Sequence, residues 1–351
     1  MADGPTGDAR HMQRAILLAA THKTHPNPRV GAVVVDDSGQ VVGEGAHEGV
    51  GRPHAEIVAL TTAGERARGS TLYVTLEPCS HQGHTPPCAG AVVDAGVSRV
   101  VLAALDPDPR VSGTGVSWLT DAGVEVESGL MAEEAEEADP AYFHHRRTGL
   151  PLVTLKLAMT IDGAVAAQDA SSQWITSAEA RRDAHVLRSA MDAVVVGAGT
   201  LRRDDPLLTA RHEGGAAQPT PVVVVGRQTL PVESRIWQRS PLIISTRPIG
   251  VPTGEVVIVG GEDDWPDPEA SARALAERGL LDVLLEGGPT LAGAWWGAGM
   301  VGRGVIYVGA RVGGGQGIGP LGGDFATVAQ SRPVNIRDVH MVGPDIRIEF
   351  D

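Results

Sequence analysis

Residues 78–88 read PCSHQGHTPPC, and residues 54–56 read HAE. His54 opens a predicted helix, Cys79 follows a predicted strand and Cys88 begins a second predicted helix, so the three side chains can converge at element ends. Zinc prefers a tetrahedron of imidazole nitrogen and thiolate sulfur, and three protein ligands leave one position for a water whose pKa the metal lowers towards neutrality. These stretches therefore predict a catalytic zinc site held by one histidine and two cysteines.

Glu56 stands two residues after the histidine. Its carboxylate can take a proton from the water and return it to departing ammonia, whereas a closed structural zinc site would need a fourth ligand instead. His-x-Glu followed by two cysteines is the signature of zinc-dependent nucleobase deaminases, although here eight residues separate the cysteines instead of two. We expect hydrolytic deamination with Glu56 as the catalytic proton carrier, and we expect His81 and His84 to line the substrate instead of replacing a zinc ligand.

The composition disfavours several classes of protein. The chain has 351 residues, of which 42% are hydrophobic, and this length suits two globular domains. A formal net charge of -14 disfavours a nucleic-acid partner but allows a small anionic substrate. The N-terminus lacks the layout of a signal peptide, and no apolar run of about 18 residues occurs, so we expect a cytoplasmic enzyme without a membrane partner. The 2 cysteines suit a metal site better than a disulfide framework.

Hydrophobic periodicity predicts an α/β domain in the first half of the chain. The predicted helices are 13–20, 54–63 and 88–95, and the predicted strands are 30–35, 41–45, 71–76 and 97–103. Their alternation indicates a layered domain that ends near Leu130. The glutamate-rich segment from Glu125 to Asp139 is predicted to be a solvated connecting helix.

The pattern restarts after residue 149 and predicts a second α/β domain. Its predicted strands are 153–159, 193–196, 222–225, 242–245, 256–259 and 283–285, with a helix at about 177–190. Three last strands, at 304–308, 340–341 and 346–350, are expected to close a mostly parallel sheet in antiparallel fashion. The predicted domains are residues 1–147 and 148–351.

The long insert between the cysteines, with HPNP at 25–28 and DPDP at 106–109, resembles the bifunctional deaminase-reductase family of riboflavin biosynthesis. The resemblance covers nearly all of the chain. It implies an N-terminal cytidine-deaminase-like α/β/α layered domain, a C-terminal dihydrofolate-reductase-like α/β domain, one zinc ion per chain and NADPH. The implied reactions are hydrolytic deamination of 2,5-diamino-6-(5-phosphoribosylamino)pyrimidin-4(3H)-one and reduction of 5-amino-6-(5-phosphoribosylamino)uracil to the ribitylamino product. We further expect a homo-oligomer.

The resemblance also implies contacts with the phosphorylated pyrimidine in the deaminase half. These fall on Asn27, His47, His84, Asp106 and Asp108. The family usually has a basic residue at position 84 and asparagine at position 108, so we expect the phosphate-facing and base-facing contacts to be weaker or rearranged here. His84 can still be cationic when it faces a phosphate.

In the reductase half, the informative stretches are LKL at 155–157 and SSQWIT at 171–176. By resemblance, the residues that contact substrate are Ser172, Arg188, Leu208, Arg211 and Glu286. The residues that contact the cofactor are Ala158, Trp174, Thr200, Asp204, Arg227, Gly288, Pro289 and Thr290. A lysine within an apolar strand is costly unless its amine reaches a cleft or an anion, so Lys156 is predicted to act in catalysis, where it assists protonation.

Three features support parts of this assignment on physical grounds. A guanidinium fork at Arg188 or Arg211 suits a phosphate. The glycines of EGGPT at 286–290 let backbone amides approach a pyrophosphate where a helix begins, although a tight turn would have the same composition. Arg227 either pairs with a 2′-phosphate, which favours NADPH over NADH, or is solvated.

Other functions remain open at this stage. The chain could be a deaminase with a catalytically silent reductase half, since residues 226–227 and 301–303 depart from the family pattern. A nucleic-acid deaminase of the same fold conflicts with the acidic balance. A non-catalytic ligand-binding or scaffold protein with structural zinc leaves Glu56 without a role.

Overall fold

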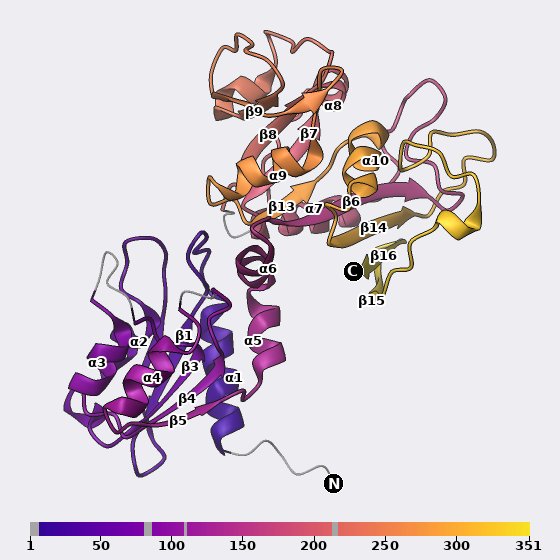
Figure 1. The fold of residues 1–351 in the computed structure, drawn as a ribbon. Coiled ribbons are helices and arrows are strands. Elements are labelled where there is room, and N and C mark those ends of the chain that lie inside the picture. The colour runs from indigo at the N-terminus through magenta and orange to yellow at the C-terminus, as the bar shows by residue number, and fades with distance from the viewer. Residues whose placement is uncertain (1–6, 81–85, 109–110, 213–216) are drawn as a thin grey trace. The chain divides into compact units, whose positions relative to one another are not determined.

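A computed structural model describes residues 7–80, 86–108, 111–212 and 217–351. The chain divides into two compact units, Met1–Gly149 and Leu150–Asp351, and each is described by itself (Figure 1). Within the described ranges, no helix has the length and apolar character needed to cross a membrane.

The first unit is built on a five-stranded sheet in the order β2-β1-β3-β4-β5. Its strands are β1 (Gly31–Val35), β2 (Val41–Ala46), β3 (Thr71–Leu76), β4 (Arg99–Ala104) and β5 (Glu125–Ser128). Its helices are α1 (Gly7–Ala19), α2 (Ala55–Ala63), α3 (Cys88–Asp94), α4 (Thr114–Asp121), α5 (Ala132–Ala138) and α6 (Pro140–Thr148), with a 3-10 turn η1 (Gly64–Ala67). Strand β1 pairs antiparallel with β2 and β3, and β3, β4 and β5 run parallel.

Helices cover both faces of this sheet (Figure 1). Val34 and Val74 face α2 and α3, whereas Val33 and Val101 face α1 and α5, because successive side chains of a strand point to opposite faces. The core therefore has two halves, one on each side of the sheet. This arrangement confirms the expected α/β/α layering.

Alternate glycines on β2 bring α2 close to the sheet. A side chain at Gly43 would place its Cβ 2.1 Å from the carbonyl oxygen of Ala59, and one at Gly45 would place it 2.2 Å from that of Ala55. Only glycine allows this approach, and it holds the first turn of α2, which carries the HAE motif, against the end of the strands.

The second unit contains a nine-stranded sheet in the order β10-β9-β8-β7-β13-β6-β14-β16-β15. Its strands are β6 (Leu152–Thr160), β7 (Ala193–Gly197), β8 (Thr220–Val225), β9 (Leu242–Ser245), β10 (Glu255–Ile258), β13 (Asp282–Leu285), β14 (Arg303–Gly309), β15 (Ile336–Val342) and β16 (Asp345–Phe350). A separate hairpin joins β11 (Gly261–Glu262) to β12 (Trp265–Pro266). The helical segments are α7 (Ala178–Ala190), α8 (Ala198–Asp204), η2 (Arg235–Arg239), α9 (Pro268–Ala276), α10 (Pro289–Gly297) and η3 (Val328–Gln330).

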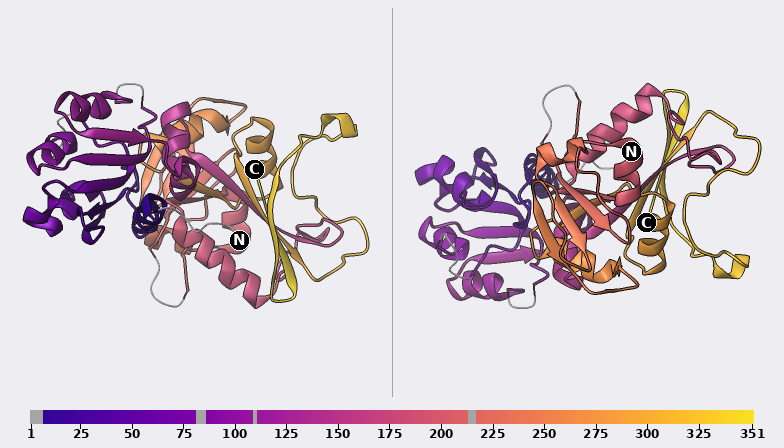
Figure 2. Two further views of the ribbon diagram at one scale, coloured as in Figure 1. Left: turned by 90° about the horizontal axis from the view of Figure 1, so that it is seen from below. Right: turned by 90° about the horizontal axis from the view of Figure 1, so that it is seen from above.

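All neighbouring strands from β10 to β14 run parallel, and β14, β16 and β15 are antiparallel. Figure 2 shows the last two strands, in yellow, side by side at one edge of the sheet. This topology confirms the expected mostly parallel sheet with an antiparallel end. The strand β13 lies between β7 and β6, so residues at its carboxyl end are brought next to residues from both neighbours.

The prediction of one solvated helix from Glu125 to Asp139 was wrong. Residues Glu125–Ser128 form β5, which pairs with β4, and Val126 packs against the core. The following helix α5 buries Ala135 on the opposite face of the sheet. A single valine among glutamates is too weak a periodic signal to reveal a four-residue edge strand. Helices α4, α6, α8 and α9 were not predicted from the sequence.

Candidate active sites

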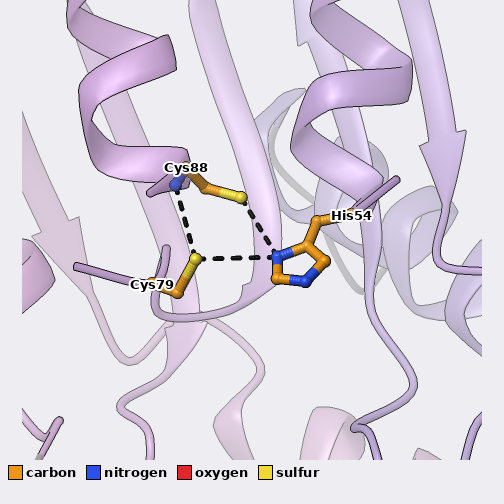
Figure 3. A group of neighbouring side chains, drawn as sticks. All are labelled: His54, Cys79 and Cys88. Atoms are coloured by element: carbon orange, nitrogen blue, oxygen red, sulfur yellow. Dashed lines mark hydrogen bonds between the residues drawn. The ribbon is translucent and has the colours of Figure 1, made fainter. Parts of the chain in front are cut away.

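Three soft or borderline metal ligands meet in the first unit. His54 is the N-cap of α2, Cys79 follows β3, and Cys88 is the first residue of α3. Their ligand atoms all lie within 4.8 Å of one another, and Figure 3 shows the three side chains converging. The Nδ1 atom of His54 is 3.2 Å from the sulfur of Cys88 and 3.6 Å from that of Cys79.

These spacings fit a zinc ion. A tetrahedron with metal–ligand bonds of about 2.0–2.3 Å has ligand–ligand edges of roughly 3.5 Å. The hydrogen bond from the Cys88 thiol holds the pKa of Cys79 well below its usual range, and His54 adds to this effect. A thiolate is therefore favoured at this position, as cation binding requires.

Glu56 lies beside these ligands on the first turn of α2. Only 3% of it is exposed, and burial raises its pKa to about 7, with a further contribution from the charge of Cys79. A carboxyl group whose pKa lies near neutrality can both accept and return a proton.

A cavity of about 230 Å³ opens in front of this cluster and is lined by His54, Glu56 and Cys79. Asn27, His47 and Asp106 line the same cavity, so three of the expected substrate contacts are brought to it. Asp108 is not among its described lining residues; its amide donates to the Asp106 carboxylate at 2.9 Å. His81 and His84 lie outside the described residues.

His47 and Asn27, which both line this cavity, orient each other through a hydrogen bond. The Nδ1–H of His47 donates to the carbonyl of Pro53 at 3.0 Å, so its Nε2 accepts from the side-chain amide of Asn27, also at 3.0 Å. Burial lowers the pKa of His47, in keeping with this neutral form. The arrangement leaves the Asn27 carbonyl oxygen to accept a hydrogen bond from a base.

A buried hydrogen bond between His25 and Asp139 holds the loop that carries Asn27. The Nε2 atom of His25 lies 2.7 Å from one carboxylate oxygen of Asp139, and the other oxygen accepts the amide of Arg29 at 2.7 Å. Asp139 precedes α6, so the loop and this helix are joined.

Sequence reasoning missed several residues of this cavity. They are Arg52, Glu77, Tyr142 and Arg146. Tyr142 donates to the Asp106 carboxylate at 3.1 Å, and burial raises the pKa of Asp106. Tyr142 and Arg146 are four residues apart on α6 and so share a helix face, but nothing local in the sequence shows that this face meets the cavity.

Glu77 could have been found, because it directly precedes the Pro78-Cys79 motif. Its buried carboxylate accepts four backbone amides, from Asp106 at 3.3 Å, Gly113 at 2.9 Å, Gly115 at 2.8 Å and Val116 at 3.2 Å. These bonds join the end of β3 to the start of α4 and to the loop after β4. Glu77 therefore positions the cavity wall.

The second unit contains a larger cavity of about 700 Å³. It brings together most of the residues expected in the reductase half, namely Lys156, Ala158, Ser172, Trp174, Arg188, Thr200, Asp204, Leu208, Arg211 and Glu286. They come from β6, the loop after it, α7, α8, the loop after α8 and the end of β13. Segments far apart in the sequence thus share one cavity.

Three charged side chains of this cavity, those of Lys156, Arg188 and Glu286, lie close together. Arg188 donates to both carboxylate oxygens of Glu286, at 2.6 and 2.9 Å, and the amine of Lys156 lies 3.9 Å from the same carboxylate. Burial alone would raise the pKa of Glu286, but the two cations lower it to about 2. Burial lowers the pKa of Lys156, and the Arg188 charge acts in the same direction while Glu286 opposes both.

Two further side chains of this cavity have fixed partners. His185 donates from Nδ1 to the carbonyl of Thr209 at 3.0 Å, so its Nε2 accepts from Arg211 at 3.1 Å. The guanidinium of Arg181 lies 4.4 Å from the centre of the exposed Trp174 ring. His185 and Arg181 were not expected from the sequence.

The glycine-rich turn lies in a neighbouring cavity of about 190 Å³. Thr200, Gly288, Pro289 and Thr290 line it together. Arg227 is not part of the described lining of either cavity; it donates to the carbonyl of Asp263 at 2.9 Å and is exposed. Its expected pairing with a 2′-phosphate stays a prediction.

The fold and sites define a two-domain enzyme that joins a zinc-dependent deaminase to a reductase. Residues 5–104 match the cytidine and deoxycytidylate deaminase zinc-binding region, and residues 151–344 match the RibD C-terminal domain. The chain belongs to the RibD family of bifunctional riboflavin-biosynthesis enzymes. The expected family, both enzyme classes and the zinc-binding character of the first half are confirmed.

Full-length relatives support this membership. The riboflavin biosynthesis protein RibD of Mycobacterium tuberculosis is 43% identical over 97% of each chain, and that of Escherichia coli is 37% identical over 97% of this chain and 98% of its own. The structure of Acinetobacter baumannii RibD has a TM-score of 0.89 at 35% identity, covering 98% of both chains. A Thermotoga maritima diaminohydroxyphosphoribosylaminopyrimidine deaminase/5-amino-6-(5-phosphoribosylamino)uracil reductase also has a TM-score of 0.89, at 31% identity over 98% of both chains.

Proposed function

We propose that this chain deaminates 2,5-diamino-6-(5-phosphoribosylamino)pyrimidin-4(3H)-one and then reduces 5-amino-6-(5-phosphoribosylamino)uracil to its ribitylamino product with NADPH. One observation carries the proposal: His54, Cys79 and Cys88 converge beside a buried Glu56 in a cavity that Asn27 also lines. The Thermotoga maritima relative is named for a deaminase and a reductase activity of the same kind, which supports the proposal.

His54, Cys79 and Cys88 are the proposed zinc ligands. When bound, zinc would supply Lewis acidity that lowers the pKa of a water beside these ligands. Glu56 takes a proton from this water while the water oxygen forms a bond to the carbon that bears the amine. Glu56 then returns the proton to the leaving nitrogen, and the carbon–nitrogen bond breaks to release ammonia.

Substrate orientation in the deaminase cavity is assigned to two fixed side chains. The Asn27 carbonyl oxygen is left to accept from the base because its amide donates to His47. Asp106 is held by the Tyr142 hydroxyl and offers a second acceptor. Two acceptors in fixed positions favour a base that presents donors, as an aminopyrimidine does.

In the reductase half, NADPH supplies the hydride when it is bound. The protein aligns the opened ribosyl carbon with it, and Lys156 supplies the proton that balances the addition. Arg188 is engaged by Glu286 and also donates to the carbonyl of Thr209 at 3.2 Å. We therefore assign the substrate phosphate to Arg211, whose guanidinium is steadied by His185.

The proposal includes a homo-oligomer in the cytoplasm. Strand β15, the last strand of the sheet in the described part of the chain, exposes Ile336, Val339 and Met341 by 65%, 55% and 60%, and exposed apolar side chains on such a strand favour association with a second copy. Sedimentation analysis of the purified chain measures the oligomeric state, and a monomer at all concentrations would contradict this part.

Zinc removal separates the two activities. Ammonia release from the diamino substrate is expected to stop after chelation and to return on addition of zinc, because the proposed ligands all lie in the first unit. NADPH oxidation on the deaminated substrate is expected to continue. Both rates are measured on the purified full chain. Ammonia release by zinc-free protein would contradict the deaminase mechanism, and absence of NADPH oxidation would indicate a silent reductase half.

A further inference from the structure

Residues 161–176, here called the contact segment, follow β6 and lead to α7. They carry Ser172 and Trp174, the expected contacts with substrate and cofactor. The cavity of about 700 Å³ and a further cavity of about 440 Å³ share residues 172–175 as a common wall. This wall therefore has a cavity on each side, and Trp174 is 58% exposed. With so little packing around it, the position of the wall depends on contacts made by the rest of the contact segment.

The contact segment is bound near its start to residues 310–318, here called the glycine segment, which follow β14. The carboxylate of Asp162 accepts the backbone amides of Gly313 at 3.0 Å and Gly314 at 2.8 Å. Two successive amides directed at one carboxylate form a compact anion-binding turn. Hydrogen bonds from Thr160 and from these amides hold the pKa of Asp162 well below its usual range. The carboxylate is therefore ionised, and the bonds are charge-assisted.

Backbone hydrogen bonds run along the same two segments. The amide of Ile161 donates to the carbonyl of Arg311 at 2.8 Å. The amide of Val165 donates to the carbonyl of Ile318 at 2.9 Å, and the amide of Ile318 donates back to Ala166 at 2.8 Å. The first part of the contact segment thus lies alongside the glycine segment. These bonds remain when a side chain is replaced, so the contribution of Asp162 can be tested separately.

The end of the contact segment is fixed by a different aspartate. The carboxylate of Asp345 accepts the amide of Ser177 at 2.6 Å and that of Ala310 at 3.1 Å. Asp345 is only 2% exposed, so its loss would leave two buried amides without a partner and would disturb the fold. Asp162 is exposed, and its replacement opens no cavity in the core. Of the two aspartates, Asp162 can therefore affect the reaction without a large effect on folding.

We propose that Asp162 is a positioning residue of the reductase reaction, because its bonds to the glycine segment hold the contact segment with Ser172 and Trp174 facing the larger cavity. The inference rests on the proposed function. A site that is assembled for only a fraction of the time binds its ligands more weakly by that fraction. Lys156 and Glu286 lie outside the contact segment, so the rate within the fully bound complex changes little when Asp162 is lost.

Steady-state kinetics of NADPH oxidation on the full-length chain test this role. Asp162→Ala is expected to raise KM for NADPH and for the deaminated substrate by about tenfold each and to leave kcat within about twofold. A loss of folded protein would instead lower the maximal rate without raising KM. Asp162→Asn keeps one acceptor oxygen and is expected to give KM values between those of wild type and Asp162→Ala. If the alanine variant does not fold, the asparagine variant carries the comparison.

Amide hydrogen exchange measured by mass spectrometry tests the contact itself. Exchange in peptides from the glycine segment is expected to be faster in Asp162→Ala than in wild type. Asp36→Ala is the matched control, because its carboxylate also accepts two backbone amides, those of Ser38 at 3.1 Å and Gln40 at 3.0 Å, but lies in the other unit. Neither KM nor exchange in the glycine segment is expected to change in this control.

Two results would overturn the inference and leave the proposed function standing. One is unchanged exchange in Asp162→Ala, which would show that the carboxylate does not hold the two segments together. The other is faster exchange with unchanged KM values, which would show that the contact has no effect on ligand binding. Absence of NADPH oxidation by the wild type would overturn the proposed reductase function and this inference with it.

Discussion

Replacement of Glu56 by glutamine is expected to leave zinc bound and to reduce ammonia release by at least about 100-fold. Glutamine has nearly the shape of glutamate but cannot take a proton from water. The side chain is 3% exposed in wild type, so the change removes a proton carrier that bulk water would not readily replace at that position. Metal analysis of the purified variant and an ammonia assay measure the two outcomes.

The same variant has an internal control. NADPH oxidation on the already deaminated substrate is expected to match wild type, since Lys156 and its cavity lie in the other unit. Glu65→Gln, at an exposed position of η1, is a matched substitution expected to change neither activity. Substantial ammonia release by Glu56→Gln would rule out the assigned role, and loss of zinc would show that the glutamate is itself needed for metal binding.

Glu286→Ala is expected to destabilise the reductase half by about 3–5 kcal/mol, because it leaves two largely buried cations without their shared partner. Arg188 loses both of its bonds to the carboxylate, and Lys156 loses its nearby anion. NADPH oxidation is expected to fall by at least about tenfold. A tenfold lower rate corresponds to a loss of about 1.4 kcal/mol in the stabilisation of the transition state. Calorimetric unfolding and the NADPH assay measure these effects.

A surface pair gives the comparison for this variant. Glu255 pairs with Arg278 at 2.6 Å but is 60% exposed, so Glu255→Ala is expected to cost only about 0–1 kcal/mol. Equal destabilisation by the two variants would contradict the buried-pair argument. Ammonia release is expected to remain unchanged in both.

The pH dependence of the Glu286 effect has a definite sign. Despite burial, Arg188 and Lys156 lower the pKa of Glu286 from 4.5 to about 2. Such a carboxylate stabilises the folded state above its unfolded pKa and loses this contribution as the pH falls towards the folded value. The stability difference between wild type and Glu286→Ala is therefore expected to be full above about pH 5 and to shrink below it. A difference that grows on acidification would contradict the assigned pairing.

Local patterns were sufficient for the chemistry of the first half. The zinc ligands and Glu56 occupy two short motifs at element ends, and those motifs need only correct helix and strand starts to be recognised. Runs of β-branched residues likewise predicted the central strands of both sheets. Prediction failed at Glu125–Ser128, where the strand is short, lies at an edge and carries a single core side chain.

The sequence by itself determined the two α/β units, the metal-binding motif and the family. Tertiary structure alone decided which distant side chains complete the sites: Tyr142 with Asp106, 36 positions apart, and Arg188 with Glu286, 98 apart. Periodicity and turn chemistry act over a few residues, whereas these contacts depend on sheet order. Because β13 pairs with β6, Glu286 at the end of β13 lies near Lys156 of β6, and Arg188 reaches the same carboxylate from α7.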